Sequence, residues 1–186
     1  ESKLIGWSMT KSITNALVGI LVSDGKIGLD EHASMKGWDA DERKAITIND
    51  LMHASSGLEW EENYGAPSGA TNMLFKKKDM GIYASSTSLR DKPGEVFYYS
   101  SGTTNILSYI IRERLGDDAY YRFPYERLFH KIGMYNTILE ADAGGTFVGS
   151  SYSFGTARDW ARFGLLYLND GVWNREQILP ERWVGY

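Results

Sequence analysis

Apolar residues recur at spacings of three and four near the start of the chain. This period is that of one face of an α-helix, and it predicts an amphipathic, mostly buried helix over residues 8–22. Gly25 lies just past the predicted end, where glycine often terminates a helix. The same spacing predicts a second strong helix over residues 106–115, which ends at Gly116.

Two Thr–Asp pairs at a spacing of three resemble the capping box of a helix start, with Asp in place of the usual Glu or Gln. Thr47 and Asp50 predict a short helix, which the Ser-Ser-Gly sequence at 55–57 ends. Thr156 and Asp159 predict another helix over the apolar positions that follow them.

The stretch between these helices, residues 58–95, is rich in Gly, Ser, Pro and Asn and is expected to hold at most one helix, around 70–80. So long a weakly patterned stretch is uncommon in a compact domain and often forms a lid or a pocket wall. A further helix is expected over 118–131, and short strands only around 144–154. The chain is therefore predicted to be helix-rich, with too few strands for a sheet of its own.

Composition and charge narrow the class of protein. The chain has 186 residues, of which 42% are hydrophobic and 24% charged, as in one ordinary soluble globular domain. A net charge of −4 argues against a nucleic-acid binder with a broad basic face, and the basic run at 76–78 is followed at once by an acidic residue. No stretch approaches the ~18 apolar residues of a membrane span. Because there is no Cys, a disulfide framework, a Cys nucleophile and a thiolate metal site are excluded.

Both ends of the chain indicate a piece of a longer protein. The chain begins at Glu1 with no initiator Met and no signal peptide. Near the other end, Pro180 occupies the place of a first helical residue, and the chain stops soon afterwards. We therefore expect residues 1–186 to be the helix-rich portion of a single domain that continues at both ends.

A Ser-x-x-Lys spacing occurs twice, at Ser8–Lys11 and at Ser23–Lys26. On a helix, residues three apart share one face, so the amine can reach the hydroxyl and accept its proton. The second pair lies in the turn that ends the first helix, where no fixed geometry is expected. The first pair lies at the start of that helix, where unpaired backbone N–H groups and the helix dipole favour a developing oxyanion. Spacing alone still favours a capping Ser with a Lys that reaches solvent.

An aromatic segment precedes the helix of residues 106–115. Tyr99 lies directly before the sequence Ser-Ser-Gly, in which Ser101 is expected to cap the helix. A Tyr in a fixed turn can aim its phenol at a neighbouring group. An aromatic core stack followed by an ordinary cap is the alternative interpretation.

The other polar residues offer weaker candidates. The histidines are scattered and lack metal-ligand spacing: His32, His53 and His130. The carboxylates on the polar loop after residue 57 are expected to form a solvated cluster: Glu59, Glu61 and Glu62. Gly144-Gly145 does not fit a phosphate-binding pattern.

Several motifs in order along the chain resemble the β-lactamase-related serine hydrolases, the group of class C β-lactamases, DD-peptidases and family VIII-type esterases. The segments that carry the resemblance are Trp7-Ser-Met-Thr-Lys-Ser12, Leu51-Met-His-Ala-Ser-Ser-Gly57-Leu58, Pro93-Gly…Phe97-Tyr-Tyr99-Ser-Ser101, Ile132-Gly-Met134, Thr156-Ala-Arg-Asp-Trp-Ala-Arg-Phe163 and Gly171-Val-Trp…Trp183. They span essentially the whole chain. The resemblance implies an α+β fold, in which a helical region packs against an antiparallel sheet, and hydrolysis without a metal or organic cofactor.

The resemblance also implies roles for single residues. Ser8 would be the acylated nucleophile, Lys11 its proton acceptor, and Tyr99 the proton relay between nucleophile and leaving group. Ser101 stands where class C β-lactamases have Asn, which argues against a β-lactam or peptidoglycan substrate. This Tyr-x-Ser element and the Glu-rich loop look closer to the 6-aminohexanoate-dimer hydrolase-like branch, in which a loop Tyr contacts the substrate's amide. Tyr64 is the best-placed candidate for that contact, and packing within the loop is its alternative.

The implied substrate is a small ester or amide, and the resemblance favours a periplasmic or secreted location. The sequence leaves the oligomeric state open. The family's N-terminal strands and its third motif (Lys-Thr-Gly or His-x-Gly) are expected to lie outside residues 1–186. Two other functions stay open: a non-catalytic penicillin-recognising or peptidoglycan-binding module, and a β-lactamase or DD-peptidase.

Overall fold

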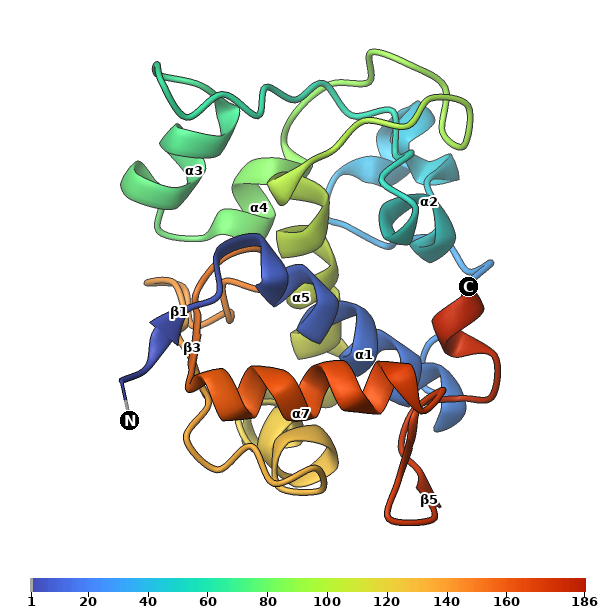
Figure 1. Cartoon of the computed structure of the whole chain (residues 1–186). Helices are drawn as coiled ribbons and strands as arrows, with labels where there is room; N and C mark the ends of the chain where they lie inside the picture. The colour runs from blue at the N-terminus through green and yellow to red at the C-terminus, as the bar shows by residue number, and fades with distance from the viewer. Residues whose placement is uncertain (1) are drawn as a thin grey trace.

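Two long helices lie at the centre of the computed structural model, which describes residues 2–186 (Figure 1). They are α1 (Thr10–Ser23) and α5 (Ser101–Leu115). Nearly every side chain from Ile13 to Leu21 is buried, so α1 is enclosed on all sides rather than along one stripe. This enclosure fixes the start of α1, which holds Lys11 and follows directly after the turn that holds Ser8, against the rest of the molecule.

Smaller helices pack around this centre. On one side lie α2 (Ile48–Met52), α3 (Gly69–Lys76) and α4 (Met80–Ser85). On the other side, α7 (Ala157–Leu168) runs beside α1, and the Tyr167 hydroxyl joins the two helices through the Asn15 side-chain oxygen (2.9 Å) (Figure 1). The remaining helical elements are α6 (Asp117–Tyr120), the π-helix η4 (Tyr125–Phe129) and the 3-10 turns η1 (Trp7–Met9), η2 (Trp38–Ala40), η3 (Glu42–Ala45) and η5 (Trp183–Gly185).

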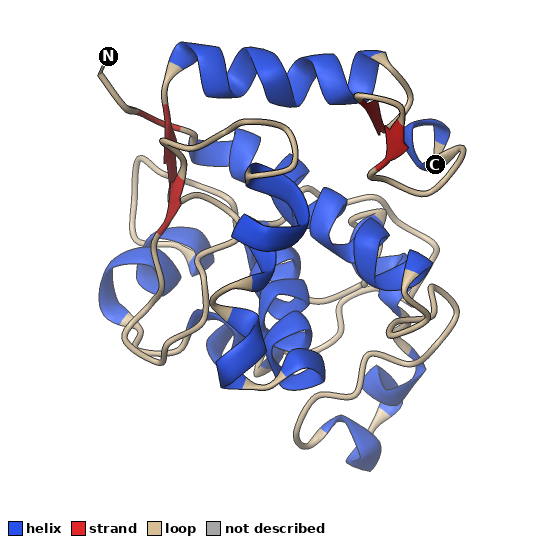
Figure 2. Ribbon diagram, turned by 90° about the horizontal axis from the view of Figure 1, so that it is seen from below, coloured by secondary structure: helices blue, strands red, loops and turns tan. Residues whose placement is uncertain are grey.

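The strands are short and form two small antiparallel sheets, which Figure 2 shows in red near the two ends of α7. One sheet has the order β1-β3-β2, from β1 (Leu4–Ile5), β3 (Ser153–Gly155) and β2 (Ile138–Leu139); the other is a hairpin of β4 (Val172–Trp173) and β5 (Glu176–Gln177). A Cβ atom at Gly6 would lie 2.3 Å from Ser153 Oγ, so only glycine allows the chain to pass this closely from β1 into η1.

Several predicted helices are confirmed. The predicted helix over 8–22 is formed by η1 and α1, and that over 106–115 by α5. Both Thr–Asp capping boxes are present, at the starts of α2 and α7. The predicted helix over 118–131 is split between α6 and the π-helix η4, because Pro124 lies between them and cannot continue the hydrogen bonding of a helix.

Other predictions about secondary structure are wrong. Residues 58–95 hold two helices, α3 and α4, rather than at most one; both are short and are stabilised by burial of side chains such as Met73 and Met80. A small three-stranded sheet does form, and β2 lies before the range 144–154. Pro180 begins a turn that leads into η5 rather than an α-helix. Among the helices of residues 2–186, none is both long and apolar enough to cross a membrane.

Candidate active site

Ser8 lies exposed on the turn η1, directly before the buried helix α1. The preceding residue, Trp7, has a φ of 43°, a left-handed conformation that is uncommon for a bulky side chain. The chain before it is fixed to β3, because the Gly6 N–H donates to the Ser153 carbonyl oxygen (2.7 Å). A sharp, well-anchored turn therefore presents the Ser8 hydroxyl at the surface.

Lys11 Nζ lies within hydrogen-bond distance of three oxygens from three segments of the chain. It is 3.2 Å from Ser8 Oγ, 3.0 Å from Ser101 Oγ and 3.0 Å from the Ser150 carbonyl oxygen. The structure thus brings Ser8 and Lys11 together, an arrangement that their spacing allows but does not by itself favour. It also adds Ser150, which no sequence pattern indicated.

The three oxygens around Lys11 determine what its amine can do. A charged ammonium group has three N–H bonds and would donate one to each oxygen. A neutral amine has two N–H bonds and a lone pair. If those two bonds point to Ser101 and the Ser150 carbonyl, the lone pair faces the Ser8 hydroxyl and can accept its proton.

Tyr99 meets Lys11 through the face of its ring. Lys11 Nζ lies 4.9 Å from the centre of the Tyr99 ring, in the range of a cation–π contact. Within residues 2–186, the Tyr99 hydroxyl has no hydrogen bond to Ser8 or Lys11. The residue is 43% exposed, so part of it is open to a bound molecule.

Ser101 is the first residue of α5 and is completely buried. The prediction that Ser101 caps this helix is wrong, because Ser100 is the cap: its hydroxyl oxygen accepts the Thr103 N–H (3.1 Å). With the cap one residue earlier, the Ser101 hydroxyl is free to reach Lys11 from the first turn of α5.

Glu62 joins the site from the loop before α3. Its Oε1 accepts the Tyr64 hydroxyl (2.5 Å) and the Ser101 hydroxyl (2.5 Å), and its Oε2 accepts Trp60 Nε1–H (2.5 Å) and the Ser101 backbone N–H (2.9 Å). The expectation of a solvated carboxylate is therefore wrong for Glu62, which is enclosed by donors. The same contacts bring the Tyr64 hydroxyl to 3.3 Å from Ser101 Oγ, so Tyr64 lies beside the site.

These contacts set the charges of Glu62 and Tyr64. Burial opposes ionisation of Glu62, but the hydrogen bonds from Ser101, Tyr64 and Trp60 outweigh it and lower the pKa of its carboxyl below the usual value. Burial and the adjacent Glu62 carboxylate raise the pKa of Tyr64 to about 12. Near neutral pH, Glu62 is therefore an anion and Tyr64 a neutral phenol.

The sequence does not reveal the role of Glu62, because its contacts with Ser101 form only when the loop that carries Glu62 folds back against the start of α5. Ser101 lies 39 positions further along the chain, and Glu59 and Glu61 look equivalent to Glu62 in the sequence. One signal was available: the donors at 60 and 64 flank position 62 at spacings of two. In an extended segment, alternate side chains face the same side.

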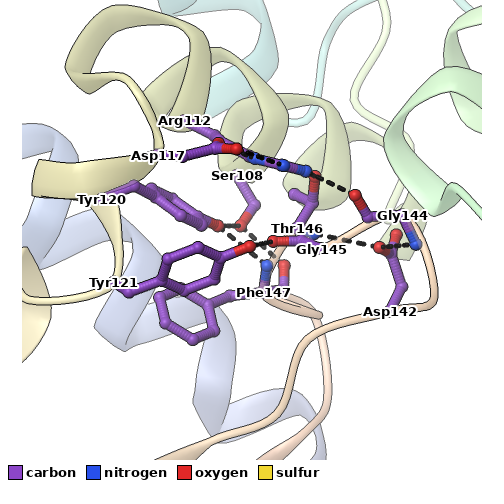
Figure 3. Close-up of polar contacts among 10 residues, drawn as sticks. All are labelled: Ser108, Arg112, Asp117, Tyr120, Tyr121, Asp142, Gly144, Gly145, Thr146 and Phe147. Atoms are coloured by element: carbon purple, nitrogen blue, oxygen red, sulfur yellow. Dashed lines mark hydrogen bonds and ion pairs between the residues drawn. The ribbon is translucent and has the colours of Figure 1, made fainter.

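A polar network anchors the loop that leads to Ser150 (Figure 3). The Arg112 guanidinium forms an ion pair with Asp117 (2.7 Å) and donates to the Gly144 carbonyl oxygen (2.6 Å). The Tyr121 hydroxyl donates to the Gly145 carbonyl oxygen (2.8 Å). The Gly144-Gly145 turn is thus occupied by contacts with α5 and the end of α6.

Two further contacts in Figure 3 fix the backbone of this loop. The Asp142 carboxylate accepts the N–H groups of Gly144 (2.9 Å) and Thr146 (3.0 Å). The buried Tyr120 hydroxyl accepts the Phe147 N–H (2.8 Å). The position of the Ser150 carbonyl, and with it that of Lys11, therefore depends on a rigid connection to α5 and α6.

A pocket of about 490 Å³ adjoins Lys11 and Tyr99. Its walls come from α1, the end of α2, the segment before α5 and the first turns of α5 itself. Several wall residues are apolar, including Leu51, Ala54, Phe97 and Leu107. His53 also lines it, and His53 Nδ1 lies 3.2 Å from the Asn49 carbonyl oxygen within its own helical turn. Within residues 2–186, no group of three or more His, Cys, Asp or Glu residues is arranged to bind a metal ion.

Comparison with known proteins gives one family match. The sequence model of the family described as Beta-lactamase matches residues 6–185. No curated protein sequence matches the chain significantly. Among solved structures, the chain is similar to a Bacillus anthracis protein provisionally named a 6-aminohexanoate-dimer hydrolase, with 25% identity and a TM-score of 0.83 over 98% of this chain and 52% of that protein.

Two other solved structures share the fold. D-amino acid amidase from Ochrobactrum anthropi has 18% identity and a TM-score of 0.74, over 98% of this chain and 59% of the amidase. Penicillin binding protein from Bacillus halodurans has 15% identity and a TM-score of 0.74, over 99% of this chain and 64% of that protein. The chain thus spans 52% to 64% of the length of these three structures. Because the family match covers nearly all of the chain, and the helices and short strands have the arrangement of this α+β fold, the chain belongs to the β-lactamase-related serine hydrolases.

Proposed function

We propose that this chain carries the nucleophile and the proton-transfer groups of a serine hydrolase that forms an acyl-enzyme on Ser8. The observation that carries the proposal is the position of Lys11 Nζ, 3.2 Å from Ser8 Oγ and oriented by Ser101 and the Ser150 carbonyl. The substrate is a carboxylic ester or a small amide. The similarity to proteins named as a 6-aminohexanoate-dimer hydrolase and a D-amino acid amidase supports that substrate class.

In the proposed acylation step, Lys11 is the base and Tyr99 the proton relay. Ser8 Oγ attacks the carbonyl carbon of the substrate while the neutral Lys11 amine accepts the hydroxyl proton. The tetrahedral intermediate then loses its alcohol or amine, and the proton passes from Lys11 through the Tyr99 hydroxyl to this leaving group. Lys11 becomes neutral again, and the acyl group remains on Ser8 as an ester.

Deacylation uses water and the same groups. Water attacks the Ser8 ester and gives one proton to the neutral Lys11 amine, and this proton returns to Ser8 Oγ as the acid leaves. Tyr64, whose hydroxyl lies 3.3 Å from Ser101 Oγ, is expected to contact the substrate's amide. Ser101 was expected to bind the substrate as well, but it is completely buried, so its proposed contribution is indirect, through Lys11. No step requires a metal or an organic cofactor.

The test compares Ser8→Ala with Ser12→Ala in the full-length protein, with a nitrophenyl ester as substrate. Ser12 is exposed one turn further along the same segment and serves as the matched control. Ser8→Ala is expected to lower kcat by about 10³-fold or more, because removal of a nucleophile abolishes the covalent route. Ser12→Ala should retain the parent rate, and both variants should keep the parent's circular dichroism. Turnover retained in Ser8→Ala would contradict the assignment of Ser8 as the nucleophile.

Two measurements on the full-length protein distinguish the proposed hydrolase from the remaining alternatives. Hydrolysis of nitrocefin that exceeds hydrolysis of simple esters would favour a β-lactamase or DD-peptidase. A stable adduct on Ser8 without repeated turnover would favour a binding module. Ser8, Lys11 and Tyr99 lie together in one site, which argues for turnover, since a binding module does not need the proton relay.

A further inference from the structure

The Glu62 carboxylate has no acceptor position left for a substrate. An ionised carboxylate offers about four lone-pair positions. Four donors occupy them: the hydroxyls of Tyr64 and Ser101, the Trp60 indole N–H and the Ser101 backbone N–H. Glu62 is therefore placed to orient protein groups rather than to bind a cationic part of the substrate.

These contacts fix the direction of the Ser101 hydroxyl proton. Ser101 has one such proton, and the contact with Glu62 Oε1 at 2.5 Å is the short, charge-assisted kind that takes it. Toward Lys11 Nζ, 3.0 Å away, Ser101 Oγ then presents only a lone pair. The Lys11–Ser101 hydrogen bond must accordingly have Lys11 as its donor.

The direction of that bond decides where the Lys11 lone pair points. The Ser150 carbonyl oxygen cannot donate, so it too accepts an N–H from Lys11 (3.0 Å). With two N–H bonds committed, a neutral Lys11 directs its lone pair to Ser8. If Ser101 instead donated to Lys11, that lone pair would be occupied and an N–H would face Ser8.

We propose that Glu62 is a positioning residue that makes Ser101 a hydrogen-bond acceptor and thereby directs the Lys11 lone pair to the Ser8 hydroxyl. This inference rests on the proposed function, in which Lys11 is the base for Ser8. Glu62 acts through Ser101 and touches neither Ser8 nor Lys11.

The first test is the rate of phosphonylation of Ser8 by a fluorophosphonate, measured in the full-length protein. Glu62→Gln replaces one acceptor oxygen by an NH₂ group, so two of the four donors lose their acceptor. The rate constant is expected to fall about 10- to 100-fold, the size of effect that follows from misplacing a catalytic group by about 1 Å. The matched control is Glu61→Gln, an exposed neighbour, which should change it by less than about two-fold. Equal rates for the parent and Glu62→Gln overturn the proposal.

A double-mutant cycle shows whether Glu62 acts through Ser101. Because the effect of Glu62 passes through the Ser101 hydroxyl, Glu62→Gln combined with Ser101→Ala should be no slower than the slower single variant. Effects that multiply in the double variant would mean that Glu62 acts by another route, and the proposal would be wrong.

Two measurements do not depend on turnover, so they separate this proposal from the assignment of Ser8. Neutron diffraction on the parent protein should find the Ser101 hydroxyl proton directed to Glu62 Oε1; a proton directed to Lys11 Nζ overturns the proposal. The Tyr64 phenol should titrate at lower pH in Glu62→Gln than in the parent, because a neighbouring negative charge has been removed. An unchanged Tyr64 titration contradicts the proposed contacts of Glu62, whatever activity Ser8→Ala retains.

Discussion

Removing the Tyr120 hydroxyl oxygen tests whether its hydrogen bond stabilises the loop that leads to Ser150. In Tyr120→Phe, the ring stays in place, but the Phe147 N–H loses the acceptor that lies 2.8 Å away (Figure 3). Tyr120 is 1% exposed and Phe147 7%, so water cannot readily replace the lost hydroxyl. Leaving a buried N–H unpaired costs about 1–3 kcal/mol, and the free energy of unfolding is expected to fall by about that amount.

Tyr121→Phe is the matched control for this prediction. Its hydroxyl donates to the Gly145 carbonyl oxygen (2.8 Å), but the side chain is 40% exposed, so water can take over the contact. We expect the free energy of unfolding of Tyr121→Phe to fall by less than about 1 kcal/mol. Urea denaturation measures both variants, with the change read from the midpoint at a common slope. A Tyr120→Phe variant as stable as the parent, or a Tyr121→Phe variant that loses as much stability as Tyr120→Phe, would show that the buried Tyr120 hydroxyl does not stabilise this loop.

Three further predictions concern the turn before the nucleophile and the charges of the site. In Gly6→Ala, the new Cβ would lie 2.3 Å from Ser153 Oγ, so urea denaturation should show that the free energy of unfolding falls by about 1–3 kcal/mol. Gly164 on α7 has open space around it, so Gly164→Ala should instead raise the free energy of unfolding by up to about 1 kcal/mol. The opposite order of stabilities would be inconsistent with the packing around these two glycines. Lys11→Met should keep the fold and lower the rate of phosphonylation of the nucleophile by about 10²- to 10⁴-fold; a rate within about ten-fold of the parent would mean that another group is the base. Because the folded pKa of Glu62 is below its unfolded value of about 4.3, its charge stabilises the fold above that pH, and this contribution is lost as the pH falls through the folded pKa. The stability difference between the parent and Glu62→Gln should therefore be larger at about pH 7 than at about pH 3, and an equal difference at both would contradict the assigned charge.

Local sequence patterns were sufficient for the elements that carry their own signals. The helix that begins at Thr10 has a long apolar repeat, and the capping boxes at Thr47 and Thr156 mark two helix starts. The helices α3 and α4 were harder to predict, because they have only 8 and 6 residues. Their stability depends on packing against α5 and against each other. So short a helix has little stability of its own, and its apolar pattern is correspondingly brief.

In the site too, local sequence patterns account for some contacts and not for others. Ser8 and Lys11 are three residues apart, so helical geometry allows their side chains to meet. The contacts of Lys11 with Ser101 and Ser150 span 90 and 139 positions, and those of Glu62 with Ser101 span 39. These contacts follow from how loops return across α5, and no local pattern contains that information.

Mapping a covalent adduct shows whether Ser8 is the acylated nucleophile. The full-length protein would be treated with a fluorophosphonate and digested with trypsin, which cuts after Lys3 and Lys11 and so isolates residues 4–11. We expect a single phosphonate on Ser8 in that peptide and none in the Ser8→Ala variant. An adduct on Ser101, or on any residue other than Ser8, would contradict it.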